Sequence, residues 1–76
     1  MQDRHLDFYI KFGLNVAYYR KLKGMTQETL AELSYTAEPN HISLIETGKV
    51  GISFDKLFDI SKALEIEPSK LLEFRD

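Results

Sequence analysis

The side chains best suited to specific chemistry lie in one short run, residues 38–44, with the sequence EPNHISL. The Asn40 amide can donate and accept together, as the edge of adenine requires, and His41 can donate or accept at a base edge. Pro39 and Leu44 can contact a thymine methyl group. Glu38 can accept from cytosine N4, or it can serve the dipole of a helix, and the sequence leaves both roles open. These five residues are therefore candidates for reading DNA bases.

Residue types argue against catalysis and metal binding. The two histidines, His5 and His41, lie far apart in the sequence, and the chain has no cysteine. No HExxH-like spacing, carboxylate cluster or nucleophile–base pair accompanies the histidines. A chain of 76 residues is also too small for a deep substrate cleft. We therefore expect no enzymatic activity, no metal or other cofactor, and no small-molecule ligand.

The elements that must position the polar run are predicted to be helices. Helical spacing of apolar residues is interrupted at short intervals by turn and capping residues, and no sustained alternation predicts a strand. The predicted helices run from Asp7 to Lys23 before Gly24, from the Thr26 cap to about Ser34, between Pro39 and Gly48, from Ser53, and from Pro68. The chain is therefore expected to be one all-α domain over residues 1–76, a compact cluster of five helices. Its helix-turn-helix would span about residues 26–47, with the second of those helices protruding toward a major groove.

The apolar positions predict which helix faces form the core. The inward residues are expected to be Phe8, Phe12, Val16, Tyr19, Leu30, Ala31, Leu33, Ile42, Ile45, Leu57, Ile60 and Leu64. The first helix also carries a second apolar stripe, Leu14, Tyr18 and Leu22, at i, i+4 and i+8. Either the chain termini cover this stripe, or it pairs with another subunit.

The charge of the chain does not by itself favour nucleic-acid binding. The formal net charge is −2, whereas DNA-binding proteins usually carry a surplus of cations that neutralise phosphates. The distribution of the cations therefore matters more than their sum. No apolar run approaches the length needed to span a bilayer, and no signal-peptide pattern opens the chain. We expect a soluble, cytoplasmic protein without a membrane partner.

The sequence between Gly24 and Lys49 resembles a known family. TQETLAEL followed by ISLIETGK is similar to the lambda-repressor and phage-Cro class of helix-turn-helix domains, the Xre family. The resemblance extends over roughly four-fifths of the chain, from Phe12 to Leu72. Its matching positions are Phe12-Gly13, Arg20, Gly24, Thr26-Gln27, Leu30-Ala31, Ile42-Ser43, Ile45-Glu46, Gly48-Lys49, Ala63-Leu64, Pro68 and Leu71-Leu72. The family implies a five-helix fold that binds double-stranded DNA.

The resemblance also implies roles for individual residues. Gln27, Ser43, Thr47 and Lys49 match positions that contact phosphates, and Gln27 is also expected to brace the third helix. Arg20 and Glu46 match positions that form an internal salt bridge. One segment departs from the family, because Ser34-Tyr35-Thr36-Ala37 replaces a turn that usually contains glycine. Two starts of the next helix follow from this departure: Thr36 caps an early start, or Glu38 is the cap and Pro39 the first helical residue.

The predicted function is sequence-specific binding of double-stranded DNA in transcriptional regulation, as a dimeric repressor. One such helix reads too few bases for useful specificity, so we expect a homodimer. Its interface is predicted to involve Leu14, Tyr18 and Leu22, or the C-terminal residues Leu71, Leu72 and Phe74. The alternative is a protein-interaction module of the same fold, an antitoxin or assembly component with weak DNA affinity, which the net charge and Glu38 favour.

Overall fold

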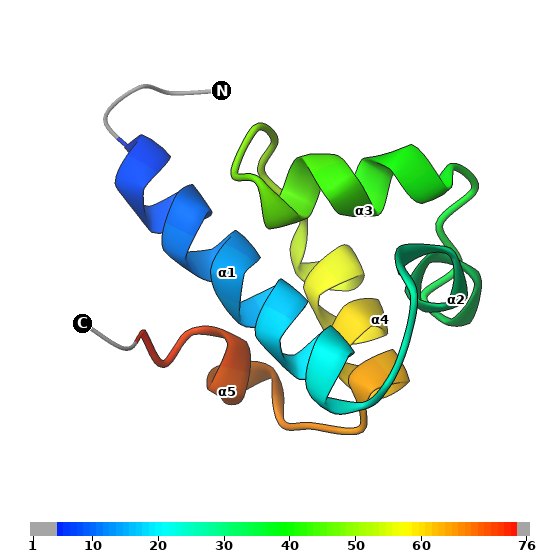
Figure 1. Ribbon diagram of the computed structural model, residues 1–76. Helices are drawn as coiled ribbons and strands as arrows, with labels where there is room; N and C mark the ends of the chain where they lie inside the picture. Colours follow the sequence, from blue (N-terminus) through cyan, green and yellow to red (C-terminus); the bar gives the residue numbers. More distant parts are fainter. Residues whose placement is uncertain (1–4, 75–76) are drawn as a thin grey trace.

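Five helices make up the computed structural model of the chain, which describes residues 5–74 (Figure 1). The helices are α1 (Leu6–Leu22), α2 (Gln27–Leu33), α3 (Pro39–Glu46), α4 (Phe54–Leu64) and α5 (Pro68–Leu71). No strand occurs within residues 5–74. The predicted all-α, five-helix fold is therefore confirmed.

Local capping signals determine where the helices begin and end. The Thr26 hydroxyl accepts a hydrogen bond from the backbone N–H of Thr29 at 3.0 Å, and the Ser53 hydroxyl accepts from Lys56 N–H at 3.1 Å. Each bond satisfies one of the backbone donors that the first turn of a helix leaves unpaired. At the end of α1, Gly24 adopts a left-handed φ of +72°, which glycine tolerates without steric cost. These capping predictions for α1, α2 and α4 hold in the structure.

Side chains from every helix meet in one apolar core. Its buried members are Phe12, Val16, Leu30, Ala31, Ile42, Ile45, Leu57, Ile60, Leu64 and Leu71. Two inward predictions were wrong: Leu33 and Phe8 are both exposed. Leu33 is the last residue of the short α2. Phe8 instead meets Phe74 edge to face, with ring centroids 5.0 Å apart.

The long α1 helix supports the rest of the domain (Figure 1). Along one side it contacts α3, and along another it contacts the short α5. The buried Asn15 amide on α1 donates to the carbonyl oxygens of Leu71 at 2.8 Å and Glu73 at 3.1 Å, which fixes the C-terminal segment. Leu71 itself is fully buried, so its predicted place in a dimer interface was wrong. None of the helices described is both long and apolar enough to cross a membrane.

Candidate nucleic-acid interface

The five predicted base-reading residues lie at the N-cap of α3 and within the helix, and the three at its N-terminal end are exposed. Glu38 occupies the N-cap position in an extended conformation without a capping hydrogen bond from its side chain, and Pro39 is the first helical residue. Of the two starts considered for α3, the structure therefore has the later one. The side chains of Glu38, Pro39 and Asn40 are exposed, and those of His41 and Leu44 are half-buried. The opposite face, with Ile42 and Ile45, is fully buried in the core.

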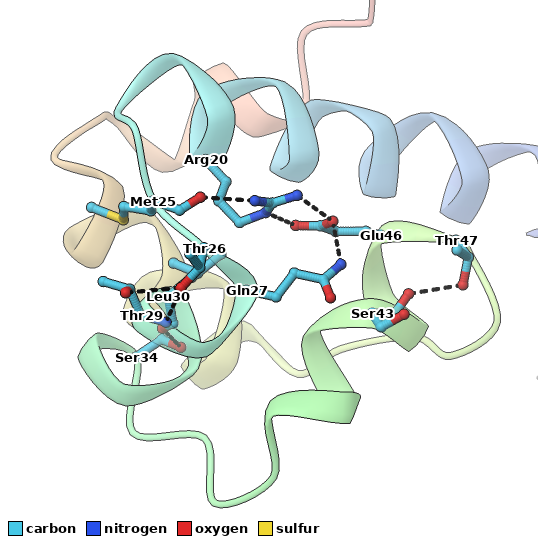
Figure 2. Close-up of polar contacts among 10 residues, drawn as sticks. All are labelled: Arg20, Met25, Thr26, Gln27, Thr29, Leu30, Ser34, Ser43, Glu46 and Thr47. Carbon is cyan, nitrogen blue, oxygen red and sulfur yellow. Dashed lines mark hydrogen bonds and ion pairs between the residues drawn. The ribbon is translucent and has the colours of Figure 1, made fainter.

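A polar network behind α3 joins the helix to α1 and α2 (Figure 2). Arg20 Nε donates to Glu46 Oε2 at 2.6 Å and Arg20 Nη2 donates to Glu46 Oε1 at 3.2 Å, which makes the pair bidentate. Arg20 Nη1 also donates to the carbonyl oxygen of Met25 at 2.8 Å. The two side chains are only 11% and 6% exposed. They form the salt bridge that the family resemblance implies, and the pair fixes the C-terminal end of α3 against α1.

Gln27 belongs to the same network. It is the first residue of α2, and its Nε2 donates to Glu46 Oε1 at 2.9 Å. One amide proton is therefore committed to Glu46, while the side chain remains half-buried rather than enclosed. A phosphate bound by the Gln27 side chain would have to use its other amide proton.

The remaining predicted phosphate residues follow one another at the end of α3. The Thr47 hydroxyl donates to the Ser43 carbonyl oxygen at 2.9 Å (Figure 2), so it is available to a phosphate as a donor only if it turns away from this bond. The Ser43 side chain is half-buried, whereas Lys49 is exposed. Lys49 follows Gly48, whose left-handed φ of +74° ends the helix, and its backbone N–H donates to Leu44 O at 2.9 Å. Lys49 is thus an exposed cation shortly after the end of α3.

A close backbone approach sets the distance between α1 and α3. A Cβ atom on Gly13 would lie 2.6 Å from the carbonyl oxygen of Glu46 and would also clash with that of Ile45. Only a glycine allows the two helices to approach this closely. Gly13 is one of the positions on which the family resemblance rests, and the structure gives the steric reason for it.

Two features of the turn between α2 and α3 were not predicted from the sequence: the backbone conformation of Tyr35 and the contact from Lys56. Tyr35 adopts a left-handed φ of +58°, the conformation that glycine would supply in this turn. Lys56 extends from α4 to the same turn, where its ammonium group donates to the Ser34 carbonyl oxygen at 2.9 Å and to Thr36 Oγ1 at 3.1 Å. No local sequence signal identifies this contact, because Lys56 lies on α4, 20 residues after Thr36.

An exposed aromatic pair on α4 was also not predicted from the sequence. Phe54 and Phe58 are 75% and 52% exposed, and their rings stack with centroids 6.2 Å apart. Phe54 borders an apolar groove of about 280 Å³, whose lining includes Phe8 and Leu72. The spacing of Phe54 and Phe58, one helical turn apart, was the signal that could have found them.

Comparison with known proteins agrees with this geometry. A family model described as "Helix-turn-helix" matches residues 16–71. The chain therefore belongs to this helix-turn-helix family, whose members are DNA-binding regulators. No curated protein matches the sequence significantly.

Two solved structures share the fold. The restriction-modification controller protein C.AhdI from Aeromonas hydrophila is 35% identical with a TM-score of 0.80, over 83% of this chain and 94% of that protein. The clp gene regulator ClgR from C. glutamicum is 28% identical with a TM-score of 0.80, over 86% of this chain and 83% of that protein. Both similarities extend over nearly the whole domain rather than over the helix-turn-helix alone.

Proposed function

We propose that the protein is a sequence-specific regulator of transcription that binds double-stranded DNA as a two-fold dimer and acts as a cytoplasmic repressor. The observation that carries this proposal is the exposed N-terminal end of α3. Pro39 and Asn40 are exposed there, while the opposite face of the same helix is buried. A helix held in this way can enter the major groove with its N-terminal residues against the base edges.

Two groups of residues have different roles in this proposal. Asn40 and His41 read base edges, with Pro39 and Leu44 as apolar contacts and Glu38 either at a cytosine or at the helix dipole. Gln27, Ser43, Thr47 and Lys49 face the phosphates. Lys49 is the only one of these four with a positive charge. We therefore expect it to provide most of the salt-dependent part of the affinity.

The decisive experiment separates base reading from phosphate binding. A preferred duplex is first selected from a random library, and affinities for that duplex and a random duplex are compared. Asn40→Ala should cost about 1–3 kcal/mol on the preferred duplex and relax the preference at one base position. Lys49→Ala should weaken both duplexes alike and lower the salt slope by about one unit per subunit. Equal, weak affinity of the wild type for every duplex would refute the proposal.

Dimerisation is the second part of the proposal. On a palindromic site the two α3 helices would lie about 34 Å apart, one turn of the duplex. The candidate surfaces are the exposed stripe of Leu14, Tyr18 and Leu22 on α1, and the C-terminal residues Leu72 and Phe74. Sedimentation of the wild type, Leu22→Ser and Leu72→Ser at high micromolar concentration would distinguish the two surfaces. A wild type that remains monomeric without DNA would count against the dimer.

The alternative function is a protein-interaction module with weak DNA affinity. The exposed apolar side chains on α1 and α4 favour it, as does the net charge of −2. Such a module would not need a polar, exposed Asn40 followed by Lys49. Retention on heparin and on duplex DNA at low salt would separate the two functions. A DNA-binding protein should be retained on both and released as the salt concentration rises, whereas an interaction module should bind neither strongly.

A further inference from the structure

The turn between α2 and α3 is stabilised by the side chain of a lysine on another helix, Lys56 on α4. The α2 helix ends with paired backbone bonds, from Thr36 N–H to Ala31 O at 2.8 Å and from Tyr35 N–H to Glu32 O at 3.3 Å. Its last turn contains no basic residue to complement the helix dipole. Lys56 supplies that charge from α4, because its ammonium group lies 2.9 Å from Ser34 O and 3.4 Å from Tyr35 O.

The hydrogen bonds in this turn have a defined direction. Lys56 can only donate, so Thr36 Oγ1 accepts its bond at 3.1 Å. The Ser34 hydroxyl is fully buried and donates to Leu30 O at 2.6 Å. Since Ser34 has no second hydroxyl proton, Thr36 donates to Ser34 Oγ across their 3.2 Å contact. The chain from Lys56 through Thr36 and Ser34 to Leu30 therefore connects α4 with the end of α2.

The position of Lys56 is itself well determined. Its backbone N–H is bound to the Ser53 hydroxyl at the start of α4, and its side chain is 21% exposed. Asp59 Oδ2 lies 3.9 Å from the ammonium group, on the same helix. The side chain is thus fixed at both ends, and its contacts lie within a few residues of Glu38 and Pro39, where α3 begins.

We propose that Lys56 is a positioning residue: it holds the left-handed turn at Tyr35 and thereby sets where α3 starts and how Asn40 is presented. Its effect on DNA reading rests on the function proposed above, but its effect on the turn does not. The left-handed conformation of Tyr35 is unfavourable for a residue with a side chain, so the turn needs support that a glycine there would make less necessary.

The test compares Lys56→Met, which keeps the length of the stem, with Lys62→Met, an exposed lysine on the same helix. In the free protein, hydrogen exchange at the amides of Thr36 and His41 should become about tenfold faster in Lys56→Met, while α1 core amides change less. Affinity for the preferred duplex should fall about tenfold, with the random-duplex affinity and the salt slope unchanged. Lys62→Met should leave all four measurements at wild-type values. Adding Tyr35→Gly to Lys56→Met should restore both the slow exchange and the preference.

Each other result has a defined meaning. Wild-type exchange at Thr36 together with wild-type preference in Lys56→Met would overturn the proposal. A salt slope lowered by one unit would also overturn it, because Lys56 would then be a phosphate contact. If Lys56→Met does not fold, Thr36→Val removes the one side-chain acceptor among the three acceptors of Lys56, and the same measurements, with smaller changes of the same sign, decide. If the wild type itself shows no sequence preference, the function proposed above fails, and the exchange rates alone decide the role of Lys56.

Discussion

Replacing Arg20 with methionine would test whether the network behind α3 stabilises the fold. The change keeps an apolar stem but removes the two hydrogen bonds to Glu46, at 2.6 and 3.2 Å, and the one to Met25 O at 2.8 Å. The Glu46 side chain, only 6% exposed, would keep Gln27 as its remaining partner in the network. The cost therefore comes chiefly from a carboxylate left nearly buried without its cation.

The magnitude follows from this burial. Removing one partner of a buried ion pair costs about 3–5 kcal/mol, and the partial exposure of Arg20 places this pair at about 3 kcal/mol. A domain of this length has a total stability of about 4–11 kcal/mol, so the loss is a large share of it. In a domain of this size each kcal/mol lowers the melting temperature by about 4–8 °C, which gives a decrease of about 12–24 °C.

Urea unfolding of Arg20→Met, Glu46→Met and the double variant would measure the interaction. The double variant should be more stable than Arg20→Met by about 1–2 kcal/mol, because it no longer buries an unpaired carboxylate. Lys21→Met, an exposed cation in the same helical turn, is the control for the loss of charge. If the free energy of unfolding of Arg20→Met is within about 1 kcal/mol of that of Lys21→Met, the ion pair does not determine stability and the reasoning is wrong.

Two further predictions concern the backbone around α3. Gly13→Ala should destabilise the fold by about 2–3 kcal/mol, since its Cβ would meet the carbonyl oxygens of Ile45 and Glu46. Gly24→Ala, where nothing lies within 4 Å, should cost only about 1 kcal/mol from its left-handed φ, and equal losses of stability in urea would refute the close-approach argument. Tyr35→Gly should raise the stability by about 1 kcal/mol, because its φ of +58° then carries no steric penalty; an unchanged or lower melting temperature would contradict this.

The helix boundaries were predictable because they depend on local chemistry. Thr26 and Ser53 cap their helices with their own hydroxyls, and Gly24 ends α1 with its own backbone conformation. Burial was less predictable, because periodicity identifies an apolar face but not what covers it. Leu33 fits the inward pattern of α2, yet the short helix leaves it exposed.

The candidate site was predictable in its residue types but not in its geometry. The family resemblance placed Arg20 and Glu46 together and implied that Gln27 braces α3, whereas the acceptor of the Gln27 amide proton, Glu46 Oε1, required coordinates. In the turn, propensity alone favours glycine for the left-handed position that Tyr35 occupies. The contact that accompanies it, from Lys56 to Thr36, joins residues 20 positions apart, and no local pattern encodes it.

The position of α3 must come from its surroundings, because α3 cannot be stable alone. Its eight residues are fewer than an isolated helix needs, and it has no side-chain cap at its N-terminus. Ile42 and Ile45 bury one face, but an apolar face permits sliding and rotation that directional contacts do not. Those contacts lie at opposite ends of α3. Lys56 holds the turn before the helix, and Glu46, the last residue of the helix, pairs with Arg20 on α1. In the proposed function, base reading would depend on hydrogen bonds that weaken steeply with small changes in distance and angle, so both ends would have to be fixed for Asn40 to discriminate. Loss of either contact should therefore reduce discrimination between duplexes before the domain unfolds.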